Sequence, residues 1–359
     1  MFGFFKKQSD SILGIDIGTT AMKLAEVKRG KKLPELLNYG ILESEDAFLR
    51  GHVGFQTSSL KFLEEQAVDF LKLLLLRVKP KTTVALASLP VFSAFTTVLT
   101  FPEMSSAEIE KSLSYQARQY IPIPISEAAL DWMKVGEYED EKGFKNIQIL
   151  LISVPKETIK KYQDIFTGAG LALKALEVET LSLVRALTQG DATPSYILDI
   201  GSRVSSILIA QNGQILFSGE TDFGGSSLTQ GLAASLNISP VRAEELKKER
   251  GIINTGPNQE LSTIMLPFLS AIINEVKKVE FAYRGRFPTA PKIERLILSG
   301  GGSNLLGIQK FFSDEMGIPV VKAAPFLRFE HSSLIEPLIP ELNPKFSVAL
   351  GLPLREFQQ

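Results

Sequence analysis

An internal repeat limits the possible folds of this chain more than any other feature of its sequence. The segment IDIGTTAMKLAEV at 15–27 matches LDIGSRVSSILIA at 198–210. Each copy has an apolar strand, an Asp-Ile-Gly turn, a hydroxyl residue and a second strand. Because the copies lie about 180 residues apart, we expect an α/β protein with two like-folded halves that face each other. Ligands tend to bind at such interfaces.

Composition excludes several kinds of site. The 359 residues include no cysteine and only two histidines, His52 and His331, so thiolate chemistry is excluded and a multi-histidine metal site is disfavoured. The 39 basic and 40 acidic side chains nearly cancel, which argues against a nucleic-acid partner. No run approaches the roughly 20 apolar residues of a membrane helix, and the N-terminal segment MFGFFKKQSD is not a signal peptide. We therefore expect a cytoplasmic protein.

Hydrophobic periodicity predicts the elements between and around the two copies. In the first half we expect strands at 12–17, 21–28 and 36–42 and a helix over 59–78. An α+β module over 83–154 follows, with strands at 83–90, 93–102, 128–138 and 146–154 and a helix behind the capping box of Ser105 and Glu108. A helix at 156–168 closes this module, and a strand at 173–178 and a helix at 180–188 lead back to the first half. Beyond a linker at 189–195, Asn212-Gly213 predicts a hairpin turn.

The turn in each copy suits a phosphate group and a magnesium ion. Glycine lets the backbone approach an anion, the amides and hydroxyls donate to it, and an aspartate can hold Mg²⁺ through water. A single such turn is more often a hairpin that its own aspartate caps, but two copies can clamp one polyphosphate. The candidates are Asp16, Gly18, Thr19 and Thr20 in the first copy and Asp199, Gly201 and Ser202 in the second, with the two aspartates near the metal.

A glycine-rich segment supplies a third candidate. In LILSGGGSNLLGI at 296–308, an apolar strand runs into Gly300, Gly301 and Gly302, and a helix is expected to begin near Ser303. Such glycines let a flat ligand lie against the backbone at a helix N-terminus. A simple glycine-rich turn remains the alternative.

Together these segments resemble the actin-like ATPase superfamily, which includes actin, sugar kinases, FtsA and MreB. IDIGTTAMK looks like the first phosphate loop, LDIGSRVSS like the second and LSGGGSN like the adenosine motif. The resemblance covers essentially the whole chain. It implies two actin-like (RNase H-like) domains around a cleft that binds ATP and Mg²⁺.

The resemblance also implies roles for individual residues. Lys23 stands at the position of a phosphate-contacting lysine, and Gly224-Gly225 matches a turn beside the phosphates. Glu179 lies in the first connecting helix, near the attacking water, and is the catalytic candidate. The segment FSVALGLPL at 346–354 looks like the second connecting helix.

Two further positions bear on the nucleotide site. Glu244 and Lys247 lie three residues apart on one helix face. In relatives this pattern touches the nucleoside, although such a pair is by itself usually an exposed ion pair of little consequence. Arg203 stands where many relatives have a second glycine. Its cation would either neutralise a phosphate or obstruct the terminal one.

The inserted module indicates the branch of the superfamily. A module at 88–169 containing QARQYIPIPISEAALDW resembles the SHS2-like, 1C-type subdomain of FtsA and of PilM, the pilus assembly family. The N-terminal FFKK, the YIPIP stretch and the length favour the PilM family. FtsA usually ends in a membrane-binding helix, whereas this chain ends ALGLPLREFQQ.

The resemblance implies a domain plan and a function. The expected subdomains are 1A (1–87, 170–190 and 340–359), 1C (88–169), 2A (191–227 and 291–339) and 2B (228–290). We expect an ATP-binding scaffold, at most a slow ATPase, of the inner-membrane platform of type IV pili. Its groove between 1A and 1C would bind the cytoplasmic N-terminal peptide of PilN. Other platform proteins are further partners, self-association is a further expectation, and membrane contact is indirect.

Two other readings stay open. One is an FtsA-like division protein that anchors to the membrane or forms filaments. The other is a small-molecule kinase of the same superfamily, although no acceptor-binding signature stands out.

Overall fold

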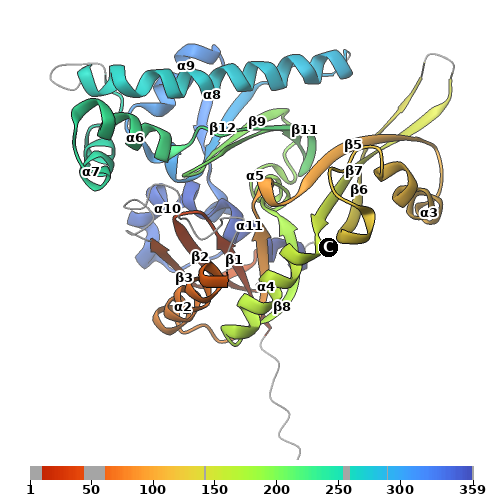
Figure 1. The fold of residues 1–359 in the computed structure, drawn as a ribbon, viewed down its shortest axis with the longest axis horizontal. Helices are drawn as coiled ribbons and strands as arrows, with labels where there is room; N and C mark the ends of the chain where they lie inside the picture. The colour runs from red at the N-terminus through yellow and green to blue at the C-terminus, as the bar shows by residue number, and fades with distance from the viewer. Residues whose placement is uncertain (1–9, 44–60, 141–142, 254–258, 289, 358–359) are drawn as a thin grey trace, which may run out of the picture.

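The computed structural model describes residues 10–43, 61–140, 143–253, 259–288 and 290–357. The N-terminal FFKK and His52 lie outside these ranges. Two five-stranded sheets form the centre of the molecule (Figure 1). The first runs in the order β3 (Glu35–Glu43), β2 (Ala21–Lys28), β1 (Ser11–Ile17), β4 (Val84–Leu89), β8 (Ala172–Val178). The second runs in the order β11 (Gln214–Thr221), β10 (Ser205–Gln211), β9 (Ser195–Ile200), β12 (Arg295–Ser299), β13 (Val320–Lys322).

The repeat in the sequence is also a repeat of topology. In each sheet the first three strands pair antiparallel and the later two join in parallel. The hairpins have matching registers, since Asp16 faces Lys23 on β1 and β2 and Asp199 faces Ser206 on β9 and β10. The prediction of two like-folded halves is confirmed.

The turn expected at Asn212-Gly213 joins β10 to β11. Both residues have positive φ, 49° and 77°, which is the conformation that a tight two-residue hairpin needs. Asn212 and Gly213 also bond to the segment that connects the halves: the Asn212 N–H donates to Asp191 O at 2.8 Å, and the Gly213 N–H donates to Thr188 Oγ1 at 3.1 Å. The turn therefore fixes the linker as well as the hairpin.

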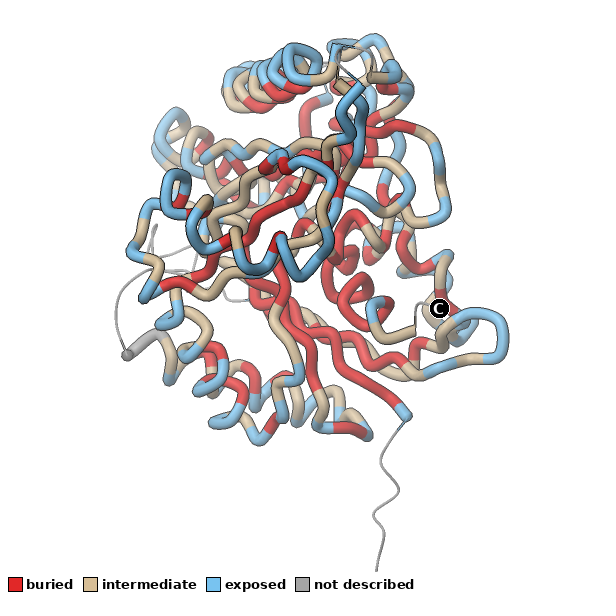
Figure 2. The backbone as a smooth tube through the Cα atoms, turned by 90° about the vertical axis from the view of Figure 1, so that its right-hand side faces the viewer, coloured by how far each residue is buried: buried red, intermediate tan, exposed pale blue. Residues whose placement is uncertain are grey.

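Helices cover the sheets in both halves. On the first half α2 (Lys61–Val78) packs against α4 (Lys156–Gly168). The second half carries α6 (Gly225–Leu236), α7 (Pro240–Arg250), α8 (Gln259–Arg286) and α9 (Ile308–Met316). The long α8 spans the top of Figure 1. Figure 2 shows the buried strands at the centre and the exposed segments around them.

Two helices connect the halves and cross closely. They are α5 (Glu179–Thr188) and α11 (Ser347–Phe357), which follows α10 (Ile339–Lys345). At the crossing, a Cβ on Gly351 would lie 2.0 Å from Ser182 O. α11 also packs on β1, where a Cβ on Gly14 would lie 2.1 Å from Ala349 O. The crossings require glycine, because any side chain would collide with backbone.

A third, three-stranded sheet is inserted between β4 and β8. Its order is β5 (Phe95–Pro102), β7 (Lys145–Pro155), β6 (Ala128–Glu139). One face is covered by α3 (Ser106–Ala117), which begins at the predicted capping box of Ser105 and Glu108. The short 3-10 helix η1 (Val91–Ser93) connects β4 to β5. The strand at 83–90, predicted as part of the module, instead pairs in the first sheet as β4. The helix predicted to close the module, α4, packs on α2 and β8 of the first half as well as on β7. The domain boundaries stay predictions.

Candidate functional site

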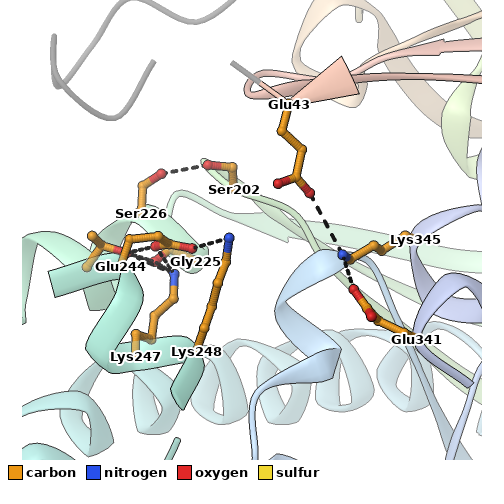
Figure 3. A network of polar contacts seen from close by, with 10 residues as sticks. Glu43, Ser202, Gly225, Ser226, Glu244, Lys247, Lys248, Glu341 and Lys345 are labelled. Carbon is orange, nitrogen blue, oxygen red and sulfur yellow. Dashed lines mark hydrogen bonds and ion pairs between the residues drawn. The ribbon is translucent and has the colours of Figure 1, made fainter. Parts of the chain in front are cut away.

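A cleft of about 410 Å³ lies between the two halves. Its lining comes from the turn after β1, the turn after β9, the N-termini of α5 and α6, one face of α7 and the glycine segment after β12. Figure 3 shows part of this lining, with side chains from α7 on one side and Lys345 of α10 on the other. Segments far apart in the sequence therefore converge on one cavity.

The first turn carries a buried ion pair. Lys23 Nζ lies 2.8 Å from Asp16 Oδ2, and the Ser88 hydroxyl donates to Asp16 Oδ1 at 2.8 Å. Burial alone would lower the pKa of Lys23, but the Asp16 carboxylate outweighs burial and raises it. The turn itself closes with the Gly18 N–H donating to Ala21 O at 2.9 Å. Asp16, Gly18, Thr19, Thr20 and Lys23 all line the cleft.

The second turn repeats the backbone hydrogen bond of the first, but its charged side chains differ. The Gly201 N–H donates to Val204 O at 3.1 Å, which repeats the bond of Gly18. Ser202 and Ser226 share a hydrogen bond of 2.6 Å between their hydroxyls (Figure 3). Burial raises the pKa of Asp199 to about 6, and the Lys23 cation only partly offsets this effect. Asp199, Gly201, Ser202 and Arg203 line the cleft.

The Gly224-Gly225 turn packs α6 against the second turn. The Gly225 N–H donates to Gly201 O at 2.9 Å and the Ser226 N–H to Ser202 O at 2.8 Å. Gly225 lines the cleft. Gly224 does not appear in the lining; a Cβ there would lie 2.6 Å from Ser202 O. Gly224 therefore permits the close contact between α6 and this turn.

The pair on α7 is buried and linked to α6. Lys247 Nζ lies 2.5 Å from Glu244 Oε2 and donates to Thr229 Oγ1 at 2.8 Å and to Gly225 O at 3.0 Å. Burial acts to raise the pKa of Glu244, but the Lys247 ammonium outweighs it and lowers the pKa. Burial lowers the pKa of Lys247. The sequence also allowed an exposed ion pair at Glu244 and Lys247, but such a pair would not make these contacts.

The glycine segment lies at the far side of the cleft. Gly300, Gly301 and Gly302 line it, and Gly300 has a φ of 80°. A Cβ on Gly301 would meet nothing within 4 Å, so this position offers open backbone to a ligand. Ser303 is buried; its hydroxyl donates to Gly300 O at 2.7 Å and does not line the cleft.

One expectation for this segment is wrong. The helix predicted near Ser303 is a single 3-10 turn, η4 (Gly301–Asn304), and α9 begins only at Ile308. Gly307 before it has a left-handed φ of 84°, which an α-helix cannot continue through. The glycines therefore shape a turn and not a helix start.

Glu179 lies at the first position of α5 and faces the cleft. Its Oε1 accepts a hydrogen bond of 3.1 Å from the N–H of Val91 in η1. Burial and the nearby Asp16 and Asp199 carboxylates raise the pKa of Glu179 to about 8. The group can therefore hold or release a proton near neutral pH.

Comparison with known proteins assigns the chain to a family. The profile of the family described as type IV pilus assembly protein PilM matches residues 14–357. This chain belongs to the PilM family.

The PilM-family chain is also similar to the cell division protein FtsA of Neisseria meningitidis serogroup B (strain ATCC BAA-335 / MC58), with 22% identity over 283 residues. That match covers 70% of this chain and 66% of FtsA, so the chain spans about two thirds of its length.

Two solved structures show the fold. A PilM-PilN type IV pilus biogenesis complex matches with a TM-score of 0.82 and 23% identity, over 97% of this chain and 99% of that chain. MreB5 of Spiroplasma citri bound to ADP matches with a TM-score of 0.55 and 14% identity, over 98% and 96%. The actin-like fold predicted from the motifs is confirmed.

Several cleft residues of the PilM-family chain escaped the sequence analysis. Ser88, which donates to Asp16 from behind the cleft lining, lies near the end of β4 and has no motif of its own. Phe92, Lys248 and Lys345 line the cleft from η1, α7 and α10. Only Lys248 had a signal, since it follows the Glu244 and Lys247 pair directly.

The described ranges contain neither a metal-binding cluster nor a membrane-crossing helix. Within them, no group of three or more acidic or histidine side chains is arranged to hold a metal ion. None of the described helices combines the length and apolar character that crossing a bilayer requires.

Proposed function

We propose that this PilM-family chain is an ATP-binding scaffold of the type IV pilus platform at the inner membrane. The observation that carries the proposal is the convergence of both repeat turns, the α7 pair and the glycine segment on one cleft. Residues predicted separately for the polyphosphate and for the nucleoside line one cavity, which supports a single nucleotide site. MreB5, a structure of the same fold, is described as bound to ADP.

The residues of the cleft fit a nucleotide. The turns at Gly18–Thr20 and Gly201–Ser202 would hold the phosphates from opposite sides, because their amides and hydroxyls can donate to phosphate oxygens. Lys23 would add a positive charge. The open backbone at Gly301 and the Glu244 and Lys247 pair would hold the nucleoside.

The two aspartates fit a magnesium ion held through water. Both Asp16 oxygens already accept bonds, from Lys23 and Ser88. A carboxylate placed in this way orients coordinated water molecules better than it coordinates a metal directly. Mg²⁺ would supply charge neutralisation for the phosphates when bound.

Glu179 is the residue we propose for any hydrolysis. With a pKa of about 8, the Glu179 carboxyl group is mainly protonated at neutral pH, and only the minor ionised fraction can accept a proton from water. Its carboxylate also bonds the Val91 N–H, which restricts its reach toward a water molecule. We therefore propose a slow ATPase at most.

We further propose the cytoplasmic N-terminal peptide of PilN as partner, in a groove between subdomains 1A and 1C. The solved structure with the TM-score of 0.82 is described as a PilM-PilN complex, and its fold covers 97% of this chain. Such a partner would hold a cytoplasmic protein at the membrane indirectly. Other platform proteins and self-association remain further proposals.

Titration of a synthetic PilN N-terminal peptide, with and without Mg·ATP, tests this function. We expect a dissociation constant of 1 μM or tighter, roughly −8 kcal/mol, and a change in that constant when ATP is added. A scrambled peptide is the control. Absence of peptide binding, with ATP binding intact, would contradict the PilN assignment.

An FtsA-like division protein is the second candidate, because FtsA matches at 22% identity over 283 residues. It predicts nucleotide-dependent polymers that attach to membranes. Sedimentation with and without ATP and lipid vesicles distinguishes it. Polymers on vesicles without any PilN peptide binding would favour this candidate over the pilus scaffold.

A further inference from the structure

Arg203 reaches across the cleft from one half to the other. It follows the second turn, and within the described residues its guanidinium has no hydrogen-bond or ion-pair partner. Its Cζ lies 5.4 Å from the centre of the Phe92 ring, a cation–π distance. Both side chains line the cleft and both are exposed. The N–H donors of Arg203 are therefore available to a ligand.

Phe92 lies in the segment that joins the first half to the inserted sheet. It belongs to η1, which connects the first sheet to β5 of the inserted sheet. The neighbouring Val91 N–H donates to Glu179 in the same cleft. The segment that carries the inserted module is thus held by two cleft residues, a cation on one side and a carboxyl group on the other.

We propose that Arg203 is a phosphate-binding residue that must leave Phe92 to reach its ligand. Filling the phosphate end of the cleft would thereby release η1 and loosen the attachment of the inserted module. This inference rests on the proposed nucleotide site. It assigns to Arg203 both the recognition of phosphate and the coupling of the cleft to the inserted module.

The competition favours phosphate over the ring. A guanidinium forms charge-assisted, often bidentate bonds to phosphate, and these are stronger than a cation–π contact at an exposed site. Arg203 stands directly after Gly201 and Ser202, whose turn would cradle the same phosphate. A short rotation of a flexible side chain is then the whole change required.

Nucleotide affinities of single and double variants test the competition. We would measure binding of ATP, ADP and adenosine to wild type, F92L, R203A and the double variant. F92L keeps the apolar bulk without the ring face, so ATP should bind about two- to fivefold more tightly. R203A should weaken ATP binding roughly tenfold. Adenosine affinity should stay unchanged in every variant, which also shows that the variants are folded.

The double variant shows whether Phe92 affects ATP binding by competing for Arg203 or independently of Arg203. If Phe92 acts through Arg203, F92L gives no gain in ATP affinity on the R203A background. R29A is the matched control, because Arg29 lies 5.7 Å from the Phe357 ring and is not part of the cleft lining. It should leave all three affinities unchanged.

Amide hydrogen exchange over residues 91–102 measures the coupling between the cleft and the inserted module. In the wild type, ATP should raise exchange there; in R203A, exchange should be high already and insensitive to ATP. Unchanged ATP affinity in F92L and R203A, or a gain from F92L that persists without Arg203, would overturn the inference while leaving the nucleotide site intact. A wild-type chain that binds neither ATP nor adenosine would instead overturn the proposed function, and this inference with it.

Discussion

Asp16 and Asp199 occupy the same position in the two halves, yet the residues opposite them differ. On the first hairpin the cross-strand partner is Lys23, which forms an ion pair of 2.8 Å. On the second it is Ser206, a hydroxyl residue. The pKa of Asp199 consequently rises to about 6 on burial, with Lys23 of the other half only partly compensating. Two hairpins of equal register thus carry unequal charge.

The two hairpins therefore share their strand pairing while the charge opposite the aspartate differs. Backbone register fixes where a side chain points, so one position decides whether the carboxylate meets a cation. The cation nearest in sequence to the second turn is Arg203, which lies over Phe92. The first turn therefore has a fixed cation, one that is buried and ion-paired, whereas the second has an exposed one.

The halves also differ where the connecting helices pack. Gly14 of β1 corresponds to Ile197 of β9 in the repeat, and both are buried. Of these two strands, β1 has α11 against it, at a distance that excludes a side chain on Gly14. α11 thus packs on the first sheet, on β1, β2 and β4, whereas α5 contacts strands of both sheets.

The largest effect should come from removing the fixed cation. K23M leaves the buried Asp16 carboxylate without its partner, and such a loss costs about 3–5 kcal/mol in the free energy of unfolding. S206A, at the equivalent position, should cost about 1 kcal/mol or less. Denaturant unfolding at pH 8 compares them. Equal costs would show that the two hairpins do not differ as described, and D16N in the K23M background should recover most of the loss.

The next effect should come from the helix contact. The Cβ of G14A would lie 2.1 Å from Ala349 O and 2.5 Å from Pro353 Cδ, so the variant should lose about 2–3 kcal/mol by overpacking. I197V, at the matched position, should lose about 1 kcal/mol. Thermal unfolding of both variants checks the order. A smaller loss for G14A would mean that α11 can move away from β1.

A smaller effect, on ligand binding, should distinguish the two ion pairs on α7. The Lys247–Glu244 side chains are 11% and 12% exposed, whereas Arg242–Glu245 are both 53% exposed. K247A should weaken adenosine binding about tenfold, because it leaves Glu244 with a buried, poorly compensated charge. R242A should change binding by less than about 0.5 kcal/mol. Calorimetric titration compares them, and a similar loss in both variants would place the nucleoside elsewhere.

The sequence was sufficient for the parts of this site that depend on local pattern. Alternation of apolar residues predicted the hairpins, and the repeated Asp-Ile-Gly turns predicted two facing halves. The capping box predicted the start of α3. The alternation, each turn and the capping box depend on residues a few positions apart, and the repeat requires only that two such segments be compared.

Contacts between distant segments could not be predicted in this way. The support of Asp16 by Ser88 and the position of Arg203 over Phe92 depend on how separate elements pack. The glycine pattern predicts a helix start where the turn Gly301–Asn304 forms, because the left-handed conformation of Gly307 has no signature beyond glycine itself. The pattern also predicts Ser303 as a ligand contact and gives no sign of the bond that its hydroxyl donates to Gly300 O.

The smallest effect concerns the carboxyl group that faces both turns. Because the pKa of Glu179 is raised to about 8, the group is mainly protonated at pH 7 and becomes charged as the pH rises through 8. Its negative charge would then repel a polyphosphate. ATP affinity should therefore fall about threefold between pH 7 and pH 9 at physiological ionic strength, and E179Q should remove this fall.

Glu341 supplies the matched control for that titration. It also lines the cleft, but its bond to Lys345 lowers its pKa, so it stays charged over this whole range. E341Q should shift ATP affinity by a similar amount at pH 7 and pH 9 and leave the slope unchanged. If E341Q flattens the profile or E179Q does not, the charge that varies in the cleft does not belong to Glu179. The raised pKa also sets the sign for stability: the unfolded chain loses this proton near pH 4.5 and the folded cleft only near pH 8, so stability falls as the pH rises from about 4.5 to 8 and levels off above.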